Sequence, residues 1–136
     1  MLKRFTVSMD EKLLTDFDNY ISQRKYVNRS EAIRDLFRSA LVEKEWQADK
    51  QVMGVISLVF DHHRPNLQER LTEIQHGYHH QVISTTHVHM DHCNCLEVVI
   101  VKGKAGSVVE LADGLRSIKG VRNCNLAMST TGKNLH

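Results

Sequence analysis

The sequence contains one proline, seven glycines and three cysteines among its 136 residues, and it has no long apolar run. So little proline and glycine leaves no room for an extended flexible linker. An odd number of cysteines argues against a secreted disulfide scaffold and favours a cytoplasmic protein with reduced thiols. A membrane span needs about 18–20 apolar residues, and the N-terminus MLKRFTVSMD lacks a signal-peptide core, so we expect no membrane association.

The overall charge is also small. The formal net charge is +2, with 41% hydrophobic and 25% charged residues, which is typical of a globular protein. Any binding to nucleic acid must therefore come from a local basic patch and not from the field of the whole molecule.

Histidine and cysteine are confined to the second part of the chain. All nine histidines and all three cysteines lie after residue 60. This change in composition indicates two units, residues 1–50 and residues 51–136. Each is small enough to bury only a thin core, so we expect the chain to form oligomers.

The first unit is predicted to be a strand followed by two helices. Residues 4–9 alternate between polar and apolar side chains, as a strand with one buried face does. Asp10 is a suitable N-cap for a helix that begins at Glu11. Asn28 and Glu31 have the spacing of a capping box for the second helix, and Ser30 is a competing cap.

A lone six-residue strand has no partner within its own unit, yet its backbone groups must be paired. An edge strand of a larger sheet would show the same alternation. The simpler arrangement pairs the strand with its copy in a second chain, which gives a two-stranded ribbon exposing Arg4, Thr6 and Ser8. Such a ribbon fits the major groove of DNA.

The start of the second predicted helix is a suitable site for a DNA phosphate, because its first backbone N–H groups are free. The residues there are Asn28, Arg29 and Ser30. With the strand and the segment NRSEAIRDLFRSAL, this unit resembles the ribbon-helix-helix repressors.

The second unit is predicted to run strand, helix, strand, strand, helix, strand. The strands are expected at residues 52–60, 82–90, 96–101 and 121–128, and the helices from about 65 to before Gly77 and from about 105 to 118. This βαββαβ order is the ferredoxin-like arrangement, so the chain as a whole is expected to be α+β. One face of the sheet stays open for assembly or for ligands.

A metal site is predicted at the hairpin between the second and third of these strands. His87 and His89 are two residues apart, so they point to the same face. Cys95 starts the next strand and can approach both imidazoles, and Glu97 on its face could orient one of them. The fourth position is open to water or to another side chain, such as His76 from a neighbouring chain.

The geometry of such a site decides its metal. A planar set of three nitrogens and one sulfur favours Ni(II) or Cu(II), and a tetrahedral set favours zinc. A metal-dependent enzyme is disfavoured, because no acid or base other than Glu97 accompanies the cluster.

The remaining histidines and cysteines are expected to have lesser roles. Cys124 is predicted to fill the core beneath the last strand. Cys93 could compete as a ligand, but its place in a turn holds it less firmly. Surface positions, or weak secondary metal sites, are expected for His62, His63, His79, His80 and His92.

Nearly the whole chain resembles the nickel-responsive transcriptional regulators of the NikR type. The resemblance runs through NRSEAIRDLFRSAL, the region of His76, THVHMDHCNCLEVVIVKG and GVRNCNL. It implies an ACT-like C-terminal domain that forms a homotetramer, a dimer of dimers, with two ribbon-helix-helix dimers. It also implies one Ni(II) per subunit, bound by His87, His89 and Cys95 of one chain and His76 of another.

The resemblance assigns further roles at the N-terminus. It implies base contacts by Arg4, Thr6 and Ser8, although threonine is common at the position of Ser8. Glu31 and Asp35 resemble an acidic pair that can hold a second cation between the domains.

The function implied is that of a repressor that binds a palindromic operator in double-stranded DNA when loaded with Ni(II) and controls nickel uptake genes. Cys93 is an additional thiol that could change the metal preference. Two alternatives remain: a ribbon-helix-helix regulator that senses copper, zinc, cobalt or an organic ligand, and a nickel storage or delivery protein.

Overall fold

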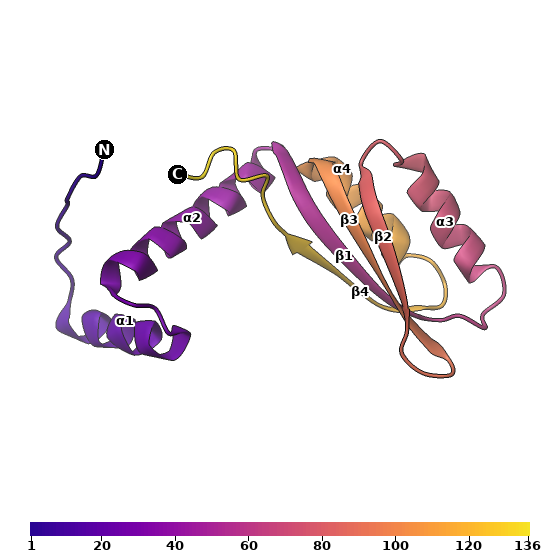
Figure 1. Cartoon of the computed structure of the whole chain (residues 1–136), viewed down its shortest axis with the longest axis horizontal. Helices are drawn as coiled ribbons and strands as arrows, with labels where there is room; N and C mark the ends of the chain where they lie inside the picture. The colour runs from indigo at the N-terminus through magenta and orange to yellow at the C-terminus, as the bar shows by residue number, and fades with distance from the viewer. The chain divides into compact units, whose positions relative to one another are not determined.

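Residues 1–10 are neither helical nor paired in a strand, and they precede two helices, α1 (Glu11–Arg24) and α2 (Arg29–Gln47) (Figure 1). The computed structural model describes residues 1–136, which form two compact units, 1–40 and 41–136. The division falls inside α2, so the end of this helix belongs to the second unit. Trp46 shows why: its Nε1 donates a hydrogen bond to the Ser129 carbonyl at 2.9 Å, and its ring joins the core there.

Both predicted helix starts are confirmed. The Asp10 carboxylate accepts a hydrogen bond from the Lys12 N–H at 3.0 Å, and α1 begins at Glu11. The Asn28 side-chain oxygen accepts from the Glu31 N–H at 2.9 Å. The Glu31 carboxylate pairs with Arg34 and not with the Asn28 backbone, so only one half of the capping box forms.

The strand predicted over residues 4–9 has no partner in the single chain and is not formed there. Its apolar face is open to solvent: Phe5 is 73% exposed and Val7 is 55% exposed. A strand is defined by hydrogen bonds to a neighbour, so this segment needs a second chain to become one.

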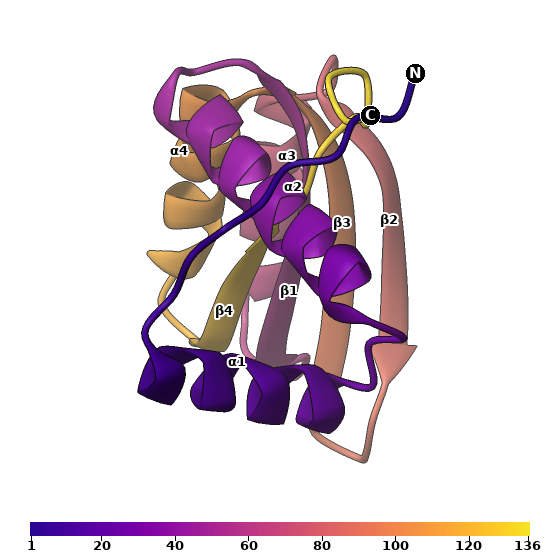
Figure 2. The same ribbon diagram turned by 90° about the vertical axis from the view of Figure 1, so that its left-hand side faces the viewer.

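The second unit has the predicted α+β order. Its elements are β1 (Gln51–Asp61), α3 (Leu67–Gly77), β2 (Val82–His89), β3 (Asn94–Lys104), α4 (Ala105–Arg116) and β4 (Val121–Met128). The four strands pair antiparallel in the order β2-β3-β1-β4 (Figure 2). This is the ferredoxin-like topology expected from the sequence.

Some predicted boundaries were wrong by a few residues. Helix α3 begins at Leu67, because Asn66 before it has a left-handed backbone (φ 64°) and Pro65 lies in the preceding loop. Helix α3 was expected to end before Gly77, but Gly77 is its last residue. Strand β3 is longer than predicted, since it pairs with β1 along its whole length, from Gln51↔Lys104 to Asp61↔Asn94.

The core lies between the sheet and the helices α3 and α4. Alternate side chains of β1 are fully buried, and Phe60, Leu58 and Ile56 are among the largest. They pack in one cluster with Leu71 of α3 and Leu111 of α4. None of the four helices is both long and apolar enough to span a membrane.

Candidate metal centre

The hairpin of β2 and β3 places the predicted ligands on one face of the sheet. His89 is paired with Cys95, and His87 with Glu97, in register. Cys95 and Glu97 have the same strand parity as the buried Val99, so all four point to the face covered by the helices. Cys95 is fully buried, whereas His89 lies at the exposed edge of the sheet.

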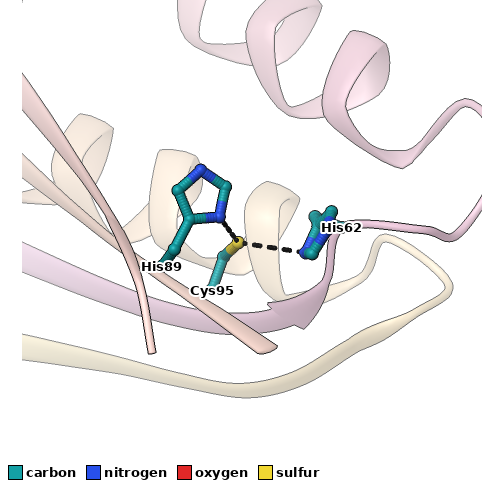
Figure 3. A group of neighbouring side chains, drawn as sticks. All are labelled: His62, His89 and Cys95. Carbon is teal, nitrogen blue, oxygen red and sulfur yellow. Dashed lines mark hydrogen bonds between the residues drawn. The ribbon is translucent and has the colours of Figure 1, made fainter. Parts of the chain in front are cut away.

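Two imidazoles lie against the Cys95 thiol (Figure 3). The Sγ atom is 3.3 Å from Nδ1 of His89 and 3.5 Å from Nδ1 of His62. These three side chains come from the end of β2, the start of β3 and the loop after β1. Their donor atoms all lie within 4.8 Å of one another, a spacing suited to one metal ion.

His62 was expected at the surface or in a weak secondary metal site, and it is half-buried beside Cys95. The structure holds it by two hydrogen bonds to the Cys93 carbonyl, from its backbone N–H at 3.1 Å and involving ring Nδ1 at 2.9 Å. The sequence contained a signal for this position. His62 follows the buried Phe60 by two residues, so its side chain is expected on the same face of the sheet, the one that the helices cover. We expected the turn to hold Cys93 loosely. Instead, these hydrogen bonds tie the Cys93 backbone to the loop after β1.

His87 lies next to this group without joining it. Its ring centroid is 5.0 Å from that of His89 and 5.8 Å from that of Phe60. Its Nδ1 is 3.8 Å from Oε1 of the buried Glu97, and Glu97 accepts a hydrogen bond from Gln75 Nε2 at 3.0 Å. The Glu97 carboxylate thus lies beside this imidazole, and its role in orienting the ring stays a prediction.

His76 does not reach the cluster within one chain. It lies in the last turn of α3, where its ring stacks on His79 at a centroid distance of 5.6 Å. His79 and His80 are exposed, as expected. Cys124 is half-buried and packs against the core from β4, also as expected.

The donors at the hairpin suit a transition metal. Burial raises the pKa of the Cys95 thiol, and the carboxylates of Asp61, Asp91 and Glu97 raise it further. A thiol in this environment stays protonated unless a cation joins it, because a coordinated thiol gives up its proton. Imidazole nitrogens with one thiolate suit nickel, copper or zinc and exclude the hard cations magnesium and calcium.

The predicted DNA-contacting residues lie in the N-terminal unit. Arg4, Thr6 and Ser8 are exposed on the extended segment. Arg29 forms two hydrogen bonds of 2.9 Å to the carboxylate of Asp18, which tie the start of α2 to α1.

The acidic pair at the start of α2 is already engaged. Glu31 pairs with Arg34, and Asp35 accepts a hydrogen bond from the Tyr26 hydroxyl. The structure therefore does not join these two carboxylates around a shared position.

Comparison with known proteins finds a family match at each end of the chain. Residues 53–129 match the family of the NikR C-terminal nickel-binding domain, and residues 3–44 match the ribbon-helix-helix proteins of the copG family. The chain belongs to the NikR family. It is a nickel-responsive regulator with a ribbon-helix-helix DNA-binding region, and not an enzyme.

Relatives of similar length support this assignment. A nickel-responsive regulator of Desulfotalea psychrophila is 62% identical over 136 residues, which cover 100% of both chains. Another of Geobacter sulfurreducens is 54% identical over 98% of this chain and 96% of its own.

A solved structure also shares part of the fold. An uncharacterized protein of Thermotoga maritima aligns with 57% of this chain and 96% of its own, at a TM-score of 0.52 and 14% identity. At this level of identity, the likeness concerns the fold alone. Nickel is the metal of the family, and the donors grouped around Cys95 fit it.

Proposed function

We propose that this protein is a cytoplasmic, homotetrameric repressor that binds a palindromic operator when loaded with Ni(II), one per subunit, and controls genes for nickel uptake. One observation supports the proposal most directly. A buried thiol with imidazoles beside it lies within the stretch that matches the nickel-binding family, and a ribbon-helix-helix stretch lies at the other end of the same chain.

The ligands proposed for nickel are His87, His89 and Cys95 of one subunit and His76 of another. Cys95 and His89 are already in contact, and His87 lies on β2 with its ring centroid 5.0 Å from that of His89. His76 lies at the end of α3, outside this group, so a second chain must supply it. When bound, nickel would supply coordination bonds that join side chains from two chains.

These side chains would couple the metal site to DNA binding. Bringing His76 to the hairpin of a neighbour orders the end of α3 and favours one arrangement of the two ribbon-helix-helix dimers. Metal must then bind the DNA-competent arrangement more tightly, and DNA must tighten metal binding by the same factor. A coupling of about 1–3 kcal/mol changes affinity roughly 5- to 150-fold.

The open face of the sheet is a suitable surface for the tetramer. On this face, β1 and β3 carry apolar side chains that the single chain leaves half-buried, and they include Val55, Val59, Leu96, Val98 and Ile100. A continuous apolar face of this kind favours association with another copy. In the ACT-like tetramer, we expect it to be the interface between dimers.

The DNA-binding surface would be the ribbon formed by two N-terminal segments. Arg4, Thr6 and Ser8 would face the bases in the major groove, and residues 28–30 at the start of α2 would face the phosphates. In the single chain Arg29 is paired with Asp18, so its role there is to hold the start of α2 against α1. The Glu31 and Asp35 carboxylates would accept a second cation only after leaving their present partners.

The first experiment is a Ni(II) titration of the reduced, metal-free protein followed by electronic absorption. We expect one Ni(II) per chain, a sulfur-to-nickel charge-transfer band and the spectrum of planar nickel. Binding without a sulfur band would remove Cys95 from the ligands and reopen copper, zinc or an organic effector.

The second experiment measures binding to the promoter of the protein's own gene, with and without nickel. Cys95→Ala should abolish the nickel response but leave salt-sensitive, nonspecific DNA binding. Arg4→Ala should do the reverse and keep nickel binding while losing operator preference. Nickel-dependent operator binding that survives in Cys95→Ala would contradict the proposed linkage, and failure of the wild type to bind DNA would favour nickel storage.

A further inference from the structure

A second group of metal-ligand side chains lies beside the Cys95 cluster. It consists of Asp61 at the end of β1, His63 in the following loop and Cys93 in the β2–β3 turn. One ligand atom of each lies within 4.8 Å of the others. None of these three belongs to the nickel ligands proposed above.

The backbone around this group is fixed before any ion arrives. The Asp91 carboxylate accepts hydrogen bonds from the N–H groups of Cys93 at 2.9 Å and Asn94 at 2.7 Å, which shapes the turn. The Cys93 carbonyl accepts the His62 N–H at 3.1 Å, so the turn is joined to the loop after β1. The His63 N–H in turn donates to Asp61 Oδ1 at 2.9 Å.

The group is more accessible than the Cys95 cluster. Cys95 is fully buried, whereas Cys93 and Asp61 are half-buried and His63 is exposed. Asp61 and His63 also line an open hollow of about 550 Å³ between the loop after β1 and the start of β4. An ion can therefore reach these donors from solvent without disturbing the core.

The donor atoms suit a tetrahedral ion. Zinc binds thiolate, imidazole and carboxylate at about 2.0–2.3 Å, which puts ligand atoms about 3.3–3.8 Å apart. His63 Nδ1 and Asp61 Oδ1 are already 3.3 Å apart. The Cys93 Sγ atom lies within 4.8 Å of the other two ligand atoms, so it must approach them by at most about 1.5 Å, within the reach of a rotation about its side-chain bond.

The ion-pair partner of Asp61, Arg122, lies at Oδ2, so Oδ1 keeps a second lone pair besides the one that accepts the His63 N–H. Arg122 is 3.8 Å from Oδ2, while its closer contact is the Asn94 side-chain oxygen at 2.8 Å. Oδ1, the atom nearest His63, faces the group. His92, whose ring centroid is 5.2 Å from that of His63, lies close enough to supply a fourth ligand in place of water.

We propose that Asp61, His63 and Cys93 form a second divalent-metal site, tetrahedral and of the zinc class, separate from the nickel site. One thiolate, one imidazole and one carboxylate do not make the planar nitrogen-rich set that nickel favours. The two sites therefore differ in preferred geometry as well as in position.

The test uses the full-length, reduced protein loaded with one Ni(II) per chain and then titrated with Co(II). Cobalt adopts the tetrahedral geometry of zinc and absorbs visible light, and it binds more weakly than nickel to a given site, so nickel stays in place. We expect one Co(II) per chain, with tetrahedral visible bands and a sulfur-to-cobalt charge-transfer band. Excess Zn(II) should displace the cobalt and bleach these bands.

Variants separate this site from the nickel site. Cys93→Ser should lose the sulfur-to-cobalt band and at least ten-fold in Co(II) affinity, and His63→Gln should lose affinity with the band retained. Both variants should keep the nickel spectrum. Cys124→Ser is the matched control, and it should change neither Ni(II) binding nor Co(II) binding. Absence of cobalt uptake by the nickel-loaded wild type, or a sulfur-to-cobalt band that survives in Cys93→Ser, would overturn the proposal whatever the protein does on DNA.

Discussion

The Nδ1 atom of His62 lies 3.5 Å from the Sγ atom of Cys95, although 33 residues separate them in the chain. The contact forms because β1 and β3 are neighbours in the sheet, which brings the loop after β1 to the start of β3. It places the imidazole of His62 beside that of His89 against one buried thiol, whereas the proposed nickel set uses His87, whose ring centroid is 5.0 Å from that of His89. The choice between His62 and His87 is therefore open to a direct test.

We expect His87→Gln to lose nickel affinity by at least ten-fold and to lose the planar nickel spectrum, since an imidazole ligand is removed. His62→Gln should keep both, because its ring is held by the Cys93 carbonyl and is not required for the proposed set. Absorption titrations of the two variants, run side by side with the wild type, decide the point. If His62→Gln lost nickel affinity and His87→Gln kept it, the ligands would instead be His62, His89 and Cys95, which already lie together in the single chain.

Glu97 should tune the site without binding the metal. Its carboxylate is buried and faces His87 Nδ1 at 3.8 Å. Removing the charge in Glu97→Gln should lower nickel affinity about 10- to 100-fold with the form of the nickel spectrum unchanged. Glu69→Gln on the exposed side of α3 is the matched control, and an equal loss in both variants would argue against a role for the Glu97 carboxylate.

Phe5 should matter for assembly and not for the fold of the C-terminal unit. It is 73% exposed in the single chain, so its burial must come from a partner strand. Phe5→Ser should weaken dimerisation and operator binding, measured by sedimentation and by DNA titration, while nickel binding stays unchanged. Lys3→Ser serves as the control on the same segment, and a Phe5→Ser dimer as tight as the wild type would disprove the ribbon.

The ion pair between Asp18 and Arg29 should give the N-terminal unit a pH-dependent stability. Arg29 lowers the pKa of Asp18 below its ordinary value, chiefly by hydrogen bonding. The folded state therefore favours the ionised carboxylate. This contribution is complete above the unfolded pKa of about 3.9 and is lost as pH falls through the lower folded value.

Asp18→Asn should accordingly lower Tm by a few degrees at most near pH 7, since both partners are exposed, and the difference should shrink in high salt. Below the lowered folded pKa of Asp18, the variant and the wild type should converge. Asp16→Asn on the same helix controls for the loss of charge alone. A Tm difference that is independent of pH would contradict this account.

Gly120 should not tolerate a side chain. Its φ of 107° is strained for other residues, and an added Cβ would lie 2.4 Å from Cδ of Arg64. Gly120→Ala should cost more than about 1 kcal/mol of unfolding free energy in denaturant titrations. Gly77→Ala, where nothing lies within 4 Å of the new Cβ, should be neutral or stabilising by up to about 1 kcal/mol, and equal effects of the two changes would contradict the prediction.

Much of this molecule was determined by local sequence. The alternation in β1 fixed which of its residues are buried, and Asp10 and Asn28 fixed where the helices begin, because these effects act within a few residues of chain. The pairing of His87 and His89 on one strand face follows from the same two-residue period. Even the hairpin that brings Cys95 opposite His89 could be predicted, since a short turn leaves few registers for its strands.

The tertiary structure decided what depends on contacts between distant segments. The position of His62 beside Cys95, and of Asp61 and His63 beside Cys93, required the pairing of β1 with β3 across more than thirty residues. The end of α2 belongs to the second unit because Trp46 donates a hydrogen bond to the Ser129 carbonyl, 83 residues further along the chain. Local sequence patterns predict whether a segment is a helix or a strand and which of its faces is buried. Which elements pack against each other depends on contacts between side chains far apart in the chain, so it is seen only in the folded structure.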